Sequence, residues 1–169
     1  MNAIETILTR RSIRKFLDRK VSVEDVQTLL RAGMFAPSAN NEQPWRFVVI
    51  DERDLLDKIP EFHPWSKMLL EAPLAILVCA FVPVGKKFDM WVQDCSAATQ
   101  NILLAAHHLG LGGVWLAVHP REERITGARA LCGLPDEIYP FSIIALGYPA
   151  EHPQAVDRFD PDKVHYNHW

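Results

Sequence analysis

The sequence contains little cysteine. Only Cys79, Cys95 and Cys132 occur among its 169 residues, and no two of them form a C-x-x-C pair. This spacing excludes a disulfide framework and a zinc ribbon, and it favours a reducing compartment. Long hydrophobic runs are also missing, because the longest, residues 74–82, has about half the length of a membrane span. The first residues are too polar for a secretory signal, so we expect a soluble, cytoplasmic protein with no membrane partner.

A strong excess of charge of one sign is absent as well. Eighteen Lys and Arg residues stand against 21 Asp and Glu residues, for a net charge of −3. This balance argues against nucleic acid or an anionic membrane as the main partner. No cluster of His, Cys and carboxylates has metal-ligand spacing, so no metal site is expected. The glycines of residues 110–113 precede a predicted strand and do not form the G-x-G-x-x-G dinucleotide fingerprint, which excludes a Rossmann site.

Helical and strand patterns alternate along the first 148 residues, which predicts an α+β domain in which helices flank a central mixed or antiparallel sheet. Asn2 and Glu5 have the spacing of a capping box, and Ser22 precedes a second helical pattern. The other predicted elements are a long helix over 89–109, a helix that Pro120 opens and that runs toward Cys132, and strands over 47–50, 74–82, 114–118 and 141–146. We expect His107 and His108, at the end of the long helix, to cap its carbonyls.

The last 21 residues, 149–169, have no regular period and contain three prolines, yet they also contain Phe159, Tyr166 and Trp169. Because disordered tails have few aromatic residues, these side chains are expected to pack on another surface. We therefore divide the chain into a domain of residues 1–148 and a C-terminal arm of residues 149–169, which we expect to lie on a partner subunit.

Basic residues are concentrated near the start of the chain. Six of the 18 Lys and Arg residues lie within residues 10–20, which we call the basic segment. Guanidinium groups and a serine hydroxyl can hold a phosphate dianion through charge-assisted hydrogen bonds. The alternative is a solvated basic face that complements a helix dipole.

A second polar segment lies between the second helix and the first strand. Residues 36–47 contain two prolines, and within them residues 37–43, which we call the amide loop, carry hydroxyl and amide side chains that could bind a planar polar ligand. The alternative is a turn whose side chains bond their own backbone.

Taken together, the two segments resemble those of a known protein family. The R-R-S-I-R-x-F run followed by A-P-S-A-x-N-x-Q-P-W-x-F closely resembles the nitroreductase family of FMN-dependent oxidoreductases. The likeness continues through H-H-L-G-L-G-G-V-W-L-A and A-L-G-Y-P and covers nearly the whole chain. It implies the nitroreductase-like fold and a homodimer with FMN at the subunit interface.

The resemblance also implies a set of cofactor-binding residues. The expected phosphate contacts are Arg10, Arg11, Ser12 and Arg14, with Arg158 closing the site from the arm. The expected contacts with the flavin ring are Lys67, Trp115, Leu116 and Ala117, and those from the other subunit's amide loop are Pro37, Ser38, Ala39, Asn41 and Gln43. No catalytic side chain is expected, because a flavin carries out the redox chemistry itself.

The function that follows from the resemblance is reduction of nitroaromatic, quinone or related acceptors with NAD(P)H, by a ping-pong two-electron cycle. Two alternatives remain open at this point. The same FMN site could serve another reaction, such as substrate oxidation or flavin fragmentation. The chain could also be a non-catalytic sensor of FMN or another phosphorylated ligand.

Overall fold

A four-stranded antiparallel sheet forms the centre of the computed structural model, which describes residues 1–83 and 89–169. The strand order is β1-β2-β4-β3. The strands are β1 (Trp45–Ile50), β2 (Leu74–Phe81), β3 (Gly112–Ala117) and β4 (Ile138–Gly147). The helices are α1 (Ala3–Thr9), α2 (Val23–Met34), α3 (Arg53–Leu56), α4 (Ile59–Phe62), α5 (Trp91–His108) and α6 (Glu122–Cys132), with 3-10 turns η1 (Ala39–Asn41), η2 (Lys67–Leu70) and η3 (Pro161–Lys163). The α+β fold with an antiparallel sheet flanked by helices is confirmed.

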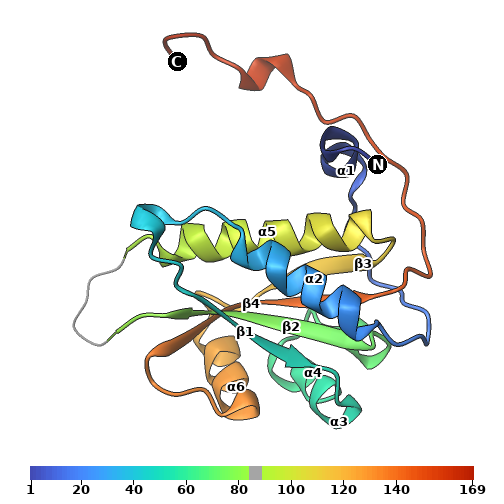
Figure 1. Cartoon of the computed structure of the whole chain (residues 1–169), viewed down its shortest axis with the longest axis vertical. Helices are drawn as coiled ribbons and strands as arrows, with labels where there is room; N and C mark the ends of the chain where they lie inside the picture. Colours follow the sequence, from blue (N-terminus) through green and yellow to red (C-terminus); the bar gives the residue numbers. More distant parts are fainter. Residues whose placement is uncertain (84–88) are drawn as a thin grey trace.

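Helices cover both faces of the sheet. Helices α2 and α5 lie on one face, and α3, α4 and α6 lie on the other (Figure 1). The middle strands β2 and β4 are therefore buried on both sides, and every residue of β2 except Phe81 is buried. This double burial explains why β2 is a continuous apolar run rather than an alternating one.

Several sequence-based boundaries are confirmed or corrected. The Asn2 side chain accepts from the Glu5 backbone N–H at 2.9 Å, and the Glu5 carboxylate accepts in return, which completes the predicted capping box. Pro120 does not open a helix, because it lies in a turn two residues before α6. Helices α3 and α4 were not predicted, since four residues are too few to display a helical period.

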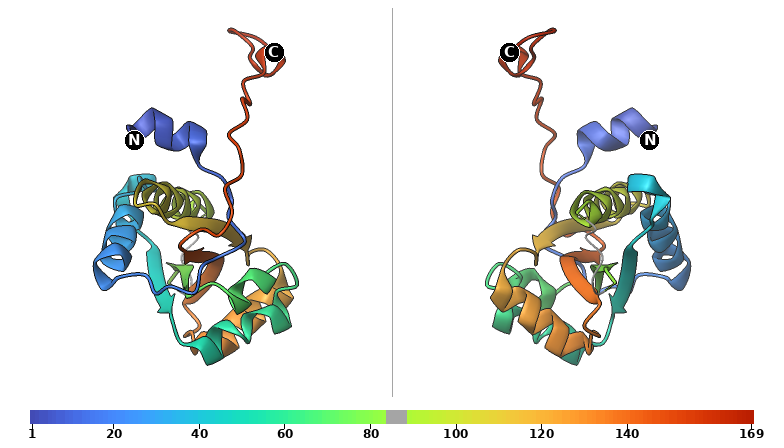
Figure 2. Two further views of the ribbon diagram at one scale, coloured as in Figure 1. Left: turned by 90° about the vertical axis from the view of Figure 1, so that its right-hand side faces the viewer. Right: turned by 90° about the vertical axis from the view of Figure 1, so that its left-hand side faces the viewer.

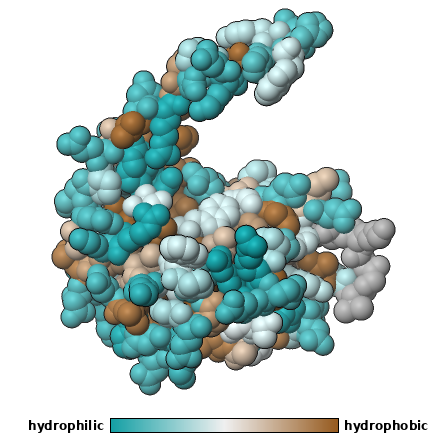
Figure 3. Space-filling model, turned by 180° about the vertical axis from the view of Figure 1, so that it is seen from behind, coloured by the Kyte–Doolittle hydropathy of each residue, from teal (hydrophilic) through white to brown (hydrophobic). Residues whose placement is uncertain are grey.

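Helix α1 and the arm stand apart from the rest of the molecule. Both extend beyond the layer formed by α5, at the same end (Figure 2). The view from behind shows a long projection that extends beyond the rest of the molecule (Figure 3). Large apolar side chains are exposed on both segments, including Ile4 at 65%, Leu8 at 65%, Phe159 at 77% and Trp169 at 102%. Such a concentration of exposed apolar surface is typical of a protein interface.

Candidate functional site

The basic segment is held between β3 and the base of the arm. The Ile13 N–H donates to the Gly113 carbonyl at 3.1 Å, and Ser12 forms a parallel bridge with Gly113. A Cβ atom added to Gly112 would lie 2.7 Å from the Ile13 Cβ, so only glycine allows this close approach. On the other side, Phe16 bridges to Pro149. These contacts bring Ser12 and its neighbouring arginines to the end of the sheet where the arm begins.

Two predicted phosphate ligands meet beside the arm. A cavity of about 580 Å³, the arm cavity, is lined by residues 7–11 and 155–159, which include Arg10 and Arg158. The pKa of Arg10 is lowered by burial and, to a lesser extent, by the positive charges of Arg158 and Arg11. Three guanidinium groups thus share the lining with a single carboxylate, that of Asp157. Such a cluster favours a bound anion, and a phosphate has the geometry that paired guanidiniums match best.

Arg11 also lines the arm cavity, and its guanidinium bonds to backbone oxygens. Its Nε donates to the Gln154 carbonyl at 3.2 Å, and its Nη2 donates to the Val156 carbonyl at 3.3 Å. Its Nη1 donates to the carbonyls of Leu8 and Arg10. Every nitrogen of this guanidinium therefore bonds to backbone, and Arg11 ties the arm to the end of α1.

A second cavity, of about 650 Å³, lies at the end of β3, and we call it the β3 cavity. It brings together five of the predicted site residues, which come from three distant parts of the chain. These residues are Arg14, Lys67, Trp115, Leu116 and Ala117. The remaining lining residues were not among the predicted cofactor contacts, and they are His63, Pro64, Trp65, Met68, Val114 and Arg124.

Two of these additional residues converge on one backbone oxygen. The His63 Nε2 lies 3.0 Å from the Ala117 carbonyl oxygen, and the Arg124 Nη1 donates to the same oxygen at 2.7 Å. Because a carbonyl can only accept, His63 carries its proton on Nε2. Burial lowers the pKa of His63, and the charge of Arg124 lowers it further, which favours the neutral imidazole. No sequence motif links these residues, which the fold alone brings to Ala117.

The lowered pKa of His63 predicts a pH dependence of stability. At pH values between the pKa of His63 in the folded protein and its ordinary value of 6.5, the unfolded chain binds more protons than the folded protein. The contribution of unprotonated His63 to stability is therefore complete above pH 6.5 and is lost as the pH falls. We expect the free energy of unfolding, measured with denaturant, to decrease from about pH 7 to about pH 5, and His63→Gln to make this decrease smaller. His165→Gln, in the exposed arm, is the control and should keep the wild-type slope. Equal slopes for wild type and His63→Gln would contradict the prediction.

The amide loop lies at the opposite end of α5 from α1 and the arm (Figure 1). Its backbone is fixed locally: the Ala39 N–H donates to the buried Asp94 Oδ1 at 3.0 Å, and the Gln43 N–H donates to the Ser38 Oγ at 3.0 Å. Pro37, Asn41 and Gln43 are exposed. None of the loop residues lines the arm cavity or the β3 cavity. A single chain therefore does not bring the amide loop together with the other predicted site residues.

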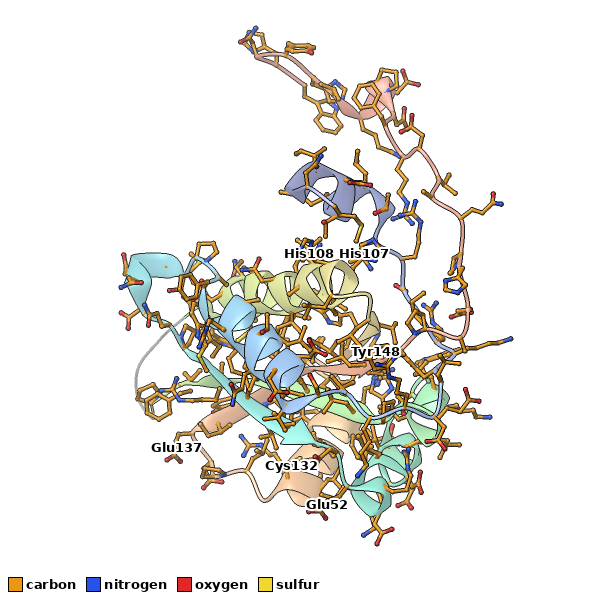
Figure 4. The ribbon with its side chains drawn as sticks, turned by 45° about the vertical axis from the view of Figure 1, so that its right-hand side comes forward. Glu52, His107, His108, Cys132, Glu137 and Tyr148 are labelled. Atoms are coloured by element: carbon orange, nitrogen blue, oxygen red, sulfur yellow. The ribbon has the colours of Figure 1, made fainter. Side chains whose placement is uncertain are left out.

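The two histidines at the end of α5 lie beneath α1 (Figure 4). The His107 Nε2 is 2.8 Å from the Thr9 Oγ1, so His107 links α5 to α1 instead of capping carbonyls as predicted. Burial, followed by the charges of Arg10 and Arg11, lowers the pKa of His107. This contact helps to place the end of α1, where the arm cavity begins.

Residues 1–83 and 89–169 contain neither a membrane-spanning helix nor a metal-ligand cluster. In this part of the chain no helix combines the length and apolar character needed to cross a bilayer. Within the same residues, no three His, Cys, Asp or Glu side chains are grouped as a metal site requires. The Cys79 and Cys95 side chains are buried, and the Cys132 side chain is half-buried.

Comparisons with known proteins agree with this arrangement. The model of the Nitroreductase family matches residues 7–73 and 63–148. A protein of Methanothermobacter thermautotrophicus, named as a candidate NADH dehydrogenase/NAD(P)H nitroreductase, is 52% identical over 100% of this chain and 88% of its own length. The solved structure of an FMN-dependent nitroreductase from Clostridium difficile R20291 has a TM-score of 0.91 and 32% identity, over 98% of this chain and 99% of that one. The NADPH:FMN oxidoreductase of Vibrio harveyi, solved with NAD+, has a TM-score of 0.88 and 27% identity, over 98% of this chain and 77% of that one.

Proposed function

The chain belongs to the nitroreductase family, and from this premise we propose that it is a cytoplasmic, FMN-dependent oxidoreductase that uses NAD(P)H to reduce nitroaromatic, quinone or related acceptors in a ping-pong cycle. The observation that carries the proposal is the pair of cavities at the two ends of the segment Arg10–Arg14. One is rich in arginine, and the other combines cations with aromatic walls. FMN combines the same two chemistries, a phosphate and a planar ring.

The arm cavity suits the phosphate of FMN. Arg10 and Arg158 supply guanidinium groups there, and Ser12 supplies a hydroxyl on the adjoining segment. Arg11 would act mainly by holding the arm, and with it Arg158, in position. A phosphate dianion between Arg10 and Arg158 would offset the repulsion that lowers the pKa of Arg10.

The β3 cavity suits the flavin ring. Arg14 and Lys67 carry positive charge to its wall, and residues 115–117 present backbone from the edge strand β3. The extended segment from Arg10 to Arg14 spans at most about 14 Å, so one elongated ligand could reach both cavities. Trp115 and Met68 offer apolar surface to a planar ring.

A homodimer would complete each site. The amide loop lies too far from both cavities of its own chain, but in a symmetric pair it could reach the cavities of the partner. The exposed apolar side chains of α1 and the arm provide the surface for such a pair. We propose that the partner subunit supplies its amide loop to the flavin and receives the arm on its surface.

When bound, FMN would supply the two-electron chemistry, accepting a hydride equivalent from NAD(P)H and passing it to the second substrate. The residues of this chain would hold the phosphate, orient the ring edge against residues 115–117 and surround it with positive charge. None of them needs to act as a nucleophile or as an acid.

The proposal is tested with purified protein. We expect a yellow protein with about one FMN per chain, and we expect NAD(P)H to bleach the flavin band under anaerobic conditions. Adding a quinone or nitroaromatic should then restore the band. Colourless protein that fails to bind added FMN would contradict the cofactor assignment. A bound flavin that NAD(P)H leaves unchanged would instead favour a sensor.

A further inference from the structure

The β3 cavity contains one cation more than the proposed cofactor site uses. Arg14, Lys67 and Arg124 all line it, and its lining includes no aspartate or glutamate. Arg14 and Lys67 are assigned to FMN above. Arg124 has no role in that assignment, and no sequence motif pointed to it.

The guanidinium of Arg124 is held in place at the cavity wall. Its Nη1 donates to the Ala117 carbonyl at 2.7 Å, and its side chain is half-buried. In the described residues, the ion pairs are Arg53 with Asp57 and Lys163 with Asp160, so Arg124 pairs with no carboxylate there. Its Nε and Nη2 likewise have no hydrogen-bond acceptor within the described part of the chain. A fixed guanidinium with free N–H groups is suited to bind a planar oxyanion in two-point fashion.

The surroundings of Arg124 favour an aromatic ligand that carries the oxyanion. Trp65 lies on the same wall and is 73% exposed, while Trp115 and Met68 add further apolar surface. The His63 Nε2 bonds to the same Ala117 carbonyl as Arg124, so this N–H is not available to the anion. The cavity thus offers apolar surface for a ring and one positioned cation beside it.

We propose that Arg124 forms an oxyanion subsite of the β3 cavity and favours substrates that carry a carboxylate or phosphate together with an aromatic ring. This inference rests on the proposed function, because it assigns Arg14 and Lys67 to FMN. The oxyanion has two candidate sources, the carboxylate of an aromatic acceptor and a phosphate of the nicotinamide dinucleotide. Either oxyanion would accept hydrogen bonds from the same N–H groups of Arg124.

The test compares two acceptors that differ in charge, 4-nitrobenzoate and 4-nitrobenzamide, on the FMN-loaded protein. We expect Arg124→Gln to lower kcat/KM for 4-nitrobenzoate by about tenfold and to change the value for 4-nitrobenzamide by less than about twofold. Arg121→Gln is the matched control, since Arg121 is exposed, immediately precedes the same helix and does not line the cavity. It should leave both values unchanged. Arg124→Lys should recover part of the loss, because it keeps the charge but not the two-point geometry.

A binding measurement separates the subsite from turnover. Benzoate and benzamide are titrated into the oxidised holoprotein, and the flavin absorbance reports their dissociation constants. Weaker binding of benzoate alone in Arg124→Gln supports the carboxylate source. A raised KM for NADH and NADPH, with both acceptors and benzoate unaffected, supports the dinucleotide phosphate. Equal effects on charged and neutral ligands, or no effect on any, would overturn the subsite even though the flavin is bleached by NAD(P)H. A protein that binds no FMN or is not bleached would instead fail the proposed function.

Discussion

Replacing Arg10 with alanine is expected to weaken FMN binding by about ten- to a hundredfold, and Arg158→Ala should have an effect of similar size. The expected loss is about 1.5 to 3 kcal/mol, which is the scale of a charge-assisted hydrogen bond. Both guanidinium groups lie at the arm cavity, where their mutual repulsion contributes to the lowered pKa of Arg10. Titration of the apoprotein with FMN, followed by flavin fluorescence, measures the effect.

Riboflavin distinguishes a phosphate contact from general damage, because it lacks the phosphate but keeps the ring. Each substitution should change riboflavin affinity much less than FMN affinity. Arg31→Ala provides a control on the exposed side of α2, remote from both cavities, and should change neither value. If FMN and riboflavin lost affinity equally, the two arginines would have some role other than holding the phosphate.

Removing two aromatic side chains from the arm is expected to dissociate the dimer and release FMN. Phe159 and Trp169 are 77% and 102% exposed in the single chain. Burying such side chains on a partner contributes about 1.5 to 3 kcal/mol each. We expect the Phe159→Ala, Trp169→Ala double variant to shift toward monomer at low micromolar concentration, as light scattering measures.

FMN affinity should fall in the same variant, although Arg158 is retained. Each proposed site draws its amide loop from the second chain, so ligand binding and assembly are linked by mass action. Gln154→Ala combined with His168→Ala removes two polar side chains from the same arm and should leave the dimer intact. If the aromatic double variant stayed dimeric and bound FMN as tightly as the parent, the arm would not be an interface element.

Much of the fold could be predicted from local pattern. The capping box at Asn2, the cap at Ser22 and the apolar run of β2 each depend on neighbouring residues, and the structure confirms them. The boundaries were less accurate, since β4 begins at Ile138, three residues before the predicted strand. Hydrogen bonds to neighbouring strands extend a strand beyond its apolar residues, and a single sequence does not reveal them.

The sequence by itself determined the chemistry available to the site: a group of arginines, a loop of amides and a strand edge, in the order that marks the family. Only the tertiary structure decided how these groups are used. It turned the guanidinium of Arg11 toward the arm backbone and brought His63 and Arg124 to one carbonyl oxygen, that of Ala117. It also placed the amide loop at the far end of α5, which the order of segments along the chain does not indicate. The reason is physical: a side chain's type fixes which bonds it can form, whereas its partners, 54 residues away in the case of His63, are chosen by packing across the sheet.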